Sequence, residues 1–97
     1  MPVLEKVFNQ TLMLQEYTMS EGLVRGLVSA IPFIEENSLQ RLFLDNCGIT
    51  GDEFAAILDA CQVHKVFRSI IYRMNGVSEK CIHSLTPFLN RRPPVHL

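Results

Sequence analysis

The sequence lacks any cluster of charge of one sign. Its 97 residues include nine Lys or Arg and ten Asp or Glu, so the net charge is −1 and the isoelectric point lies near 6.3. Proteins that bind nucleic acid or an anionic membrane usually present a basic patch. We therefore expect neither nucleic acid nor a membrane surface among the partners of this chain.

Long apolar runs are also missing. The most apolar stretch, residues 22–34, is interrupted by Arg25 and Pro32 and is shorter than the roughly 20 residues that a membrane-spanning helix needs. The first ten residues lack the basic and apolar blocks of a secretory signal. We expect a chain that neither crosses nor is exported through a membrane.

Cysteine and glycine are sparse, with three and five residues respectively. An odd number of cysteines without framework spacing is typical of free thiols in a reducing compartment. We therefore expect a cytoplasmic protein, with association with the cytoskeleton as a further option. The glycines are dispersed, so no glycine-rich phosphate loop is present. The hydrophobic content of 47% and charged content of 20% indicate one folded domain with a modest core.

What the sequence does contain is a repeated pattern. Residues 39–50, LQRLFLDNCGIT, carry apolar side chains at a spacing that fits neither a helix nor a simple strand. When the pattern is moved forward so that Leu39 falls on Phe67, it and the apolar residues after it meet residues of similar character. The pairs are Leu39 with Phe67, Leu42 with Ile70, Leu44 with Tyr72, Cys47 with Asn75, Ile49 with Val77, Phe54 with Ile82, Ile57 with Leu85, and Cys61 with Leu89.

A further match lies earlier in the chain, at a slightly longer offset. It pairs Leu42 with Leu12, Leu44 with Leu14, Cys47 with Tyr17, Ile49 with Met19, Phe54 with Val24, Ile57 with Leu27, Leu58 with Val28, and Cys61 with Ile31. The longer connection after Ile31 absorbs the difference between the two offsets. The pattern predicts one domain over residues 1–90, built from about three units (about 8–36, 37–64 and 65–90), and an extended tail over 91–97.

Each unit is predicted to be a short strand, a tight turn and a helix. A hydroxyl residue follows the strand segment in every unit, at Ser20, Thr50 and Ser78, where it would cap the next helix. Thr50 is followed three residues later by Glu53, which is the pattern of a capping box. After these positions the apolar residues change to helical spacing.

This pattern resembles the leucine-rich repeat, L-x-x-L-x-L-x-x-N/C-x-L. It is carried by LQRLFLDNCGI (residues 39–49) and more loosely by FRSIIYRMNGV (residues 67–77). The period near 28 and the helical second half are similar to the ribonuclease-inhibitor type, which also occurs in innate-immune receptors, actin-capping proteins and ciliary proteins. The resemblance implies an α/β solenoid arc with parallel strands on a concave face and helices on a convex face.

Within such an arc the interior positions have structural roles. Leu42 and Leu44 point inward from a strand, and Leu39 and Ile49 enter the same core from the adjacent turns. Asn75 would bond the backbone groups of its bend, which would otherwise be unpaired at a cost of about 1–3 kcal/mol each. Cys47 would fill the equivalent place as a small apolar residue with a weak donor.

The outward strand positions form rows from unit to unit. The central row is Met13, Phe43 and Ile71, and the flanking rows are Thr11, Arg41, Ser69 and Gln15, Asp45, Arg73. An apolar ridge between polar rows on a concave sheet predicts a protein-binding site. Its candidate residues are Met13, Phe43, Ile71, Arg41, Asp45 and Arg73. The alternative is that the row packs against another part of a longer chain, and that Asp45 and Arg73 form only a solvated ion pair.

Two cysteine–histidine pairs raise the alternative of a zinc site or a thiol enzyme. Cys61 precedes His64 by three residues, and Cys81 precedes His83 by two. A structural zinc site needs four ligands in paired motifs, and no positioned base or oxyanion site accompanies the thiols. His96, in the tail, is a surface residue in this interpretation. We therefore predict no enzymatic activity, no metal and no cofactor.

The ends of the chain suggest that it depends on a neighbour. Leu4, Val7 and Phe8 have helical spacing, as in a terminal cap, whereas residues 91–97 contain two prolines and no cap. Three units are near the minimum for a stable solenoid. We predict a protein-binding or assembly module whose partner is another protein or further repeats of a longer chain. A structural repeat segment inside a cytoskeletal or ciliary assembly remains the alternative.

Overall fold

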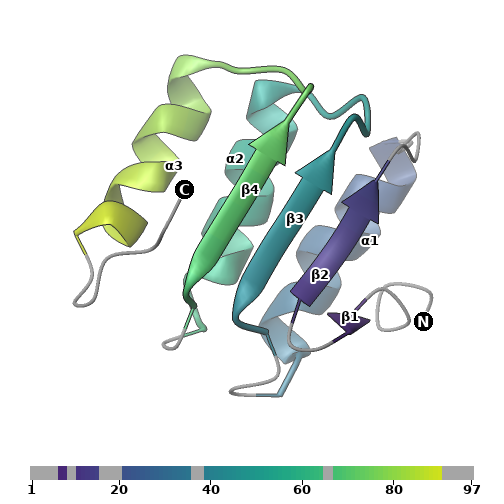
Figure 1. The fold of residues 1–97 in the computed structure, drawn as a ribbon, viewed down its shortest axis with the longest axis vertical. Coiled ribbons are helices and arrows are strands. Elements are labelled where there is room, and N and C mark those ends of the chain that lie inside the picture. Colours follow the sequence, from purple (N-terminus) through teal and green to yellow (C-terminus); the bar gives the residue numbers. More distant parts are fainter. Residues whose placement is uncertain (1–6, 9–10, 16–20, 36–38, 65–66, 91–97) are drawn as a thin grey trace.

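The computed structural model (Figure 1) describes residues 7–8, 11–15, 21–35, 39–64 and 67–90. The strands are β1 (Val7–Phe8), β2 (Thr11–Gln15), β3 (Arg41–Asp45) and β4 (Ser69–Arg73). The helices are α1 (Glu21–Ala30), the short 3-10 helix η2 (Ile31–Phe33), α2 (Gly51–Cys61) and α3 (Glu79–Leu89).

The described elements form a two-layer α/β structure. The sheet order is β1-β2-β3-β4; β2, β3 and β4 run parallel, and β1 pairs antiparallel with β2. Helices α1 and α2 lie behind one face of this sheet in Figure 1, and α3 lies beside α2, beyond the edge of β4. This arrangement is expected for consecutive strand–helix segments, because parallel strands need a crossover connection between them. The predicted α/β class is confirmed.

The register of the sheet agrees with the sequence offsets. Leu14 pairs with Leu44, and Leu44 pairs with Tyr72, on adjacent parallel strands. The side chains of Leu12, Leu14, Leu42 and Leu44 are buried, because alternate residues of a strand face the same side and the helices cover that side. The predicted inward direction of Leu42 and Leu44 is confirmed.

The turns contribute to the same core. Leu39, Cys47 and Ile49 are fully or almost fully buried, as are Phe54, Ile57 and Leu58 of α2. All of them belong to one hydrophobic cluster that also includes Val24 and Leu27 of α1. The middle unit is therefore packed as its sequence predicts.

The third unit departs from the prediction. Val77, Ile82 and Leu89 align with buried residues of the middle unit, yet all three are exposed, and Cys81, Ser84 and Phe88 are buried in their place. The buried side of α3 is thus displaced by one position from the alignment that relates the strands. Because α3 is the last described helix and packs on α2 along one flank only, the side of α3 that carries Ile82 and Leu89 faces solvent.

The bends after β3 and β4 have related geometry. Asn46 and Met74, the first residues after these strands, both have positive φ angles, of 53° and 57°. Asn75 accepts the Cys47 N–H at Oδ1 (2.8 Å) and donates from Nδ2 to the Leu44 and Arg73 carbonyls (3.1 and 2.7 Å). The predicted role of Asn75 is thus confirmed, although it bonds the backbone of the preceding unit as well as its own.

The start of helix α2 follows the predicted capping chemistry. Thr50 Oγ1 accepts the Glu53 N–H (3.1 Å), and Glu53 Oε1 accepts the Thr50 N–H (2.9 Å), so the capping box of α2 is confirmed. Ser78 is the N-cap residue of α3, and its hydroxyl donates to Asp52 Oδ1 (2.8 Å). Ser20 lies outside the described residues.

The chain ends differ from expectation where they are described. Val7 and Phe8, predicted at helical spacing, instead form β1 and pair with Leu12 and Thr11. A strand at this position covers the edge of β2, whose backbone groups would otherwise lack partners in the sheet. Leu4 and the predicted tail, 91–97, lie outside the described residues. Within the described ranges, no helix has the length and apolar character needed to span a bilayer.

Candidate functional site

The face of the sheet opposite the helices, here called the open face, carries the predicted central row. The in-register pairing of β2, β3 and β4 places Met13, Phe43 and Ile71 side by side. Met13 is 49% exposed, Ile71 is 38% exposed and Phe43 is half-buried between them. The structure therefore brings the three predicted apolar residues together on one accessible surface.

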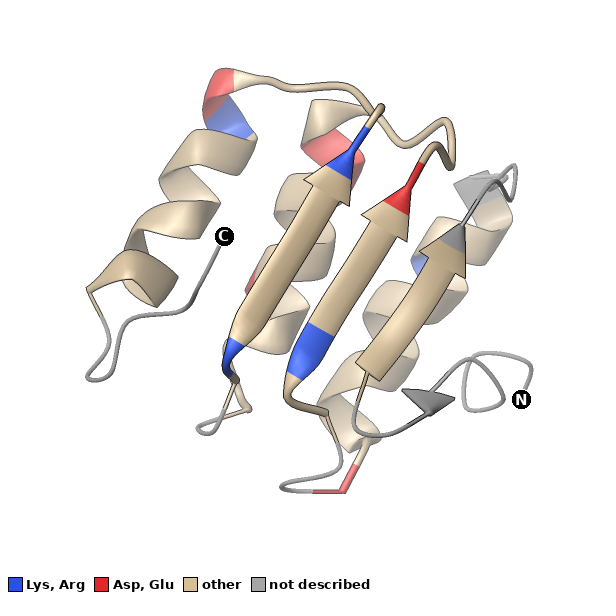
Figure 2. Cartoon of the chain, in the orientation of Figure 1, with Lys and Arg blue, Asp and Glu red and all other residues tan. Residues whose placement is uncertain are grey.

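The polar rows flank this ridge at the two ends of the strands. Arg41 is exposed next to half-buried Thr11 and Ser69. At the other end Asp45 pairs with Arg73, which is also exposed. Arg41 is the first residue of β3 and Arg73 is the last residue of β4, and Figure 2 shows basic positions at these opposite ends of the two strands. Both arginines are placed as predicted.

Asp45 is the exception among the six predicted residues. Its side chain is only 8% exposed, so the expectation of a solvated carboxylate is wrong. β3 is the central strand, and the strands on both sides shield the short aspartate side chain, whereas the longer Arg41 reaches solvent from the same strand.

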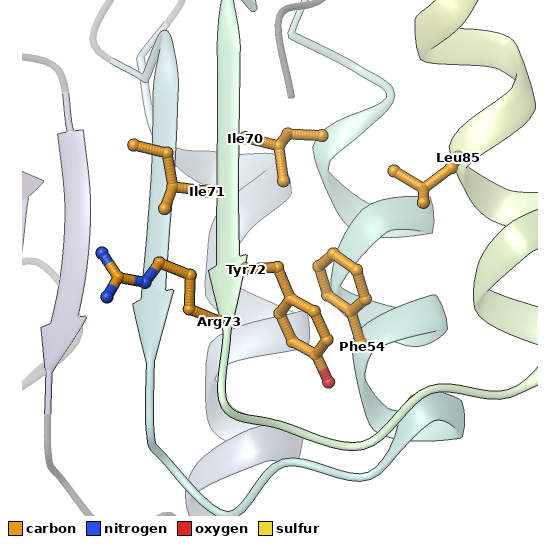
Figure 3. Close-up of a pocket in the computed structure, with 6 residues that line it drawn as sticks. All are labelled: Phe54, Ile70, Ile71, Tyr72, Arg73 and Leu85. Carbon is orange, nitrogen blue, oxygen red and sulfur yellow. The ribbon is translucent and has the colours of Figure 1, made fainter.

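Behind β4 the structure contains a hollow that the sequence did not predict. It has a volume of about 420 Å³ and is lined by Phe54, Ile70, Ile71, Tyr72, Arg73 and Leu85. In Figure 3, Ile70 and Tyr72 leave β4 on the side of the helices, Ile71 and Arg73 leave on the other side, and Leu85 extends from α3 towards β4. The lining is mostly apolar, so the hollow is suited to an apolar side chain.

Tyr72 has an unusual environment at this hollow. Its ring stacks on Phe54 with centroids 3.6 Å apart and an angle of 3° between the planes. Its hydroxyl donates to the Gly76 carbonyl and lies 3.4 Å from the Ile49 carbonyl. Burial raises the pKa of Tyr72 to about 12, with smaller contributions from the Cys81, Glu53 and Cys47 side chains.

We expect this raised pKa to appear in an alkaline titration. In a Tyr17→Phe variant, the tyrosinate absorbance of Tyr72 should have a midpoint well above 10, the ordinary value. A pKa that is higher in the folded chain means that the contribution of neutral Tyr72 to stability is complete below pH 10 and is lost as the pH rises towards 12. A midpoint near 10 in the folded variant, equal to that in denaturant, would contradict the buried position of the hydroxyl.

Three of the four residues in the cysteine–histidine pairs, Cys61, His64 and Cys81, are buried, whereas His83 is exposed. Cys47, Cys61 and Cys81 are free and buried. His64 is also buried, and its Nε2 donates to the Ile31 carbonyl (2.8 Å), which joins the end of the middle unit to the end of the first. Cys81 Sγ donates to the Ser78 carbonyl (3.0 Å). In the part of the chain that the structure describes, no three Cys, His, Asp or Glu residues are grouped as metal ligands, and His96 lies outside that part.

Comparisons with models of protein families, with curated proteins and with solved structures find no match for this chain. The leucine-rich-repeat assignment therefore rests on the residue pattern. The sequence signal related to the hollow is the position of its lining residues Ile70, Tyr72 and Leu85 in a unit that no further unit follows within the described chain.

Proposed function

We propose that this chain is a leucine-rich-repeat-like arc of about three units that binds another protein through its open face and catalyses no reaction. Parallel strands in register at the sequence offsets, helices on one face only, and bends joined by Asn75 and Cys47 support this proposal. In such an arc the open face would be the concave side, on which binding surfaces of solenoids form.

The observation that carries the proposal is the apolar row. Met13, Phe43 and Ile71 place three large apolar side chains next to one another on a surface that no described helix covers. Aromatic residues, Met and Arg are enriched at the centres of protein interfaces. Phe43 is therefore the proposed anchor, with Arg41 and Arg73 as the charged residues that select the partner. Asp45, being buried, would act on the shape of the row rather than by direct contact.

The alternatives are less well supported by the site. A thiol or zinc enzyme would need accessible thiols, whereas the three cysteines are buried. A purely structural segment of a cytoskeletal or ciliary assembly would place the same row against a fixed neighbour. Three free thiols are in keeping with a cytoplasmic location, which we retain as part of the proposal.

The proposal can be tested with a photo-reactive phenylalanine analogue at position 43. It should form a covalent product with a partner, and the purified partner should then bind the unmodified chain. Phe43→Asp should weaken this binding by about 2 kcal/mol or more, roughly 30-fold, as expected for an interface hot spot, and should leave circular dichroism and the melting temperature nearly unchanged.

Phe33→Asp is the matched control, because Phe33 is 88% exposed in η2 and lies outside the open face. This variant should bind the partner normally. Two results would contradict the proposal: equal binding by both variants, or unfolding of the Phe43→Asp chain, which would make Phe43 a core residue.

A further inference from the structure

The two edges of the sheet differ. The outer edge of β2 is paired with β1, whereas no strand of the described chain pairs with the outer edge of β4. The Arg73 carbonyl accepts from Asn46 N (2.9 Å), and Ser69 N donates to the Gln40 carbonyl (3.3 Å), so these two residues of β4 turn their backbone groups towards β3. Direction alternates along a strand, and the backbone groups of Ile70 and Tyr72 therefore point away from β3, towards the outer edge.

One of these groups is the Tyr72 carbonyl. In the two earlier units, the carbonyl at the corresponding position accepts a hydrogen bond from a side chain in the bend of the following unit. Cys47 Sγ donates to the Leu14 carbonyl (3.2 Å), and Asn75 Nδ2 donates to the Leu44 carbonyl (3.1 Å). Leu14, Leu44 and Tyr72 are register partners across the three parallel strands. The Tyr72 carbonyl is thus the next acceptor for an asparagine or cysteine side chain at the bend of an added strand.

Apolar side chains accompany this edge. The hollow behind β4 is lined by Ile70, Tyr72 and Leu85, and Ile82 and Leu89 lie three residues before and four residues after Leu85, on the same side of α3. Ile82 is 57% exposed, and Leu89 and Val77 are exposed as well. An added strand would place its inward side chains over the hollow and against these residues.

The charges of this edge are positive at both ends. Arg68 precedes β4 and Arg73 ends it, and both are exposed. On the opposite side of β4, Arg73 has the acidic Asp45 as its register partner. An acidic residue at the corresponding position of an added strand would complement the remaining side of Arg73.

From these observations we propose that the β4 edge binds an extended segment of a partner protein as a fifth strand, parallel to β4. The segment has apolar residues at two alternate positions for the hollow, an acidic residue beside Arg73, and an asparagine or cysteine at the following bend. This is β-strand addition, and it uses a surface separate from the apolar row of the open face.

Two other occupants fit less well. Pro93 and Pro94 in the C-terminal segment have no N–H to donate, and Arg91 and Arg92 repeat the positive charge of the edge. A second copy could pair its own β4 edge only in an antiparallel, two-fold arrangement. Because α3 extends beyond the edge of β4 (Figure 1), the α3 helices of two such copies would occupy the same layer and collide.

The test is a binding titration of the full chain with a fluorescent peptide that spans residues 39–49 and carries Cys47→Asn, because this sequence has every required feature. We expect a dissociation constant on the order of 10–100 µM. In a parallel strand the amides of Phe43 and Asp45 of the peptide would face β4. N-methylation of both should weaken binding roughly tenfold or more, because two backbone hydrogen bonds are lost, whereas N-methylation of Leu42 and Leu44 of the peptide should change it by less than about twofold.

Variants of the protein separate this site from the open face. Ile82→Asp, at an exposed position that should not affect folding, should weaken peptide binding about fivefold or more, and Phe43→Asp should leave it unchanged. Loss of binding in Phe43→Asp, with no effect of N-methylation, would place the peptide on the open face and overturn this proposal alone. Absence of peptide binding would also overturn it, and a dimer that Ile82→Asp disrupts would then assign the edge to a second copy.

Discussion

Replacing Gly51 with alanine is expected to destabilise the chain by about 3–5 kcal/mol, enough to unfold much of a small domain. A Cβ atom at this position would lie 2.3 Å from Ser78 N and 2.6 Å from the Val77 carbonyl carbon. Both are backbone atoms of the next turn, so a rotamer change cannot relieve the collision. Chemical denaturation followed by circular dichroism would measure the change in the free energy of unfolding.

Gly22→Ala provides the matched control. Gly22 is a helical glycine of α1 that is exposed and has no atom within 4 Å of a built Cβ. Alanine there should stabilise the chain by about 0.5–1 kcal/mol, since glycine costs this much relative to alanine in a helix. A Gly51→Ala chain as stable as the Gly22→Ala chain would contradict the close approach of Gly51 to the backbone of Val77 and Ser78.

The second large effect is expected for Asn75→Ala, at about 2–4 kcal/mol. The substitution removes the acceptor of the buried Cys47 N–H and the donor to the Leu44 and Arg73 carbonyls. The cost exceeds that of an ordinary surface hydrogen bond, because the Cys47 N–H would be left in the interior without its partner. The change should appear as a lower denaturant midpoint with an unchanged slope.

Asn90→Ala is the comparison for this variant. Asn90 is the exposed C-cap residue of α3, and its loss should change stability by less than about 0.5 kcal/mol. Equal effects of the two substitutions would contradict the bridging role of Asn75. If the slope of the unfolding free energy against denaturant concentration changed in Asn75→Ala but not in Asn90→Ala, the third unit would unfold separately from the other two.

The middle unit could be predicted closely from the sequence. The offsets that relate it to its two neighbours identified the strand register and the inward direction of Leu42 and Leu44, and the pair Thr50 and Glu53 identified the start of α2. These features depend on local chemistry and on alternation along a strand, both of which are visible in the order of the residues. The apolar row of the open face follows from the same register.

The features that could not be predicted depend on tertiary contacts, which the order of apolar and polar residues does not specify. The displacement of the buried side of α3 arises where the helix has a described neighbour on one flank only, so Val77, Ile82 and Leu89 lose the burial that their alignment implies. Val7 and Phe8 form a strand because the edge of β2 offers backbone partners. Asp45 is buried by its position on the central strand, although its place in the row was correctly predicted.

The short strand β1 also occupies one border of the parallel sheet. It pairs antiparallel with one border of the parallel sheet, so that border cannot accept the β4 border of another copy. Head-to-tail growth by direct pairing of β4 with β2, of the kind that produces filaments from complementary ends, would therefore require the two residues of β1 to be displaced.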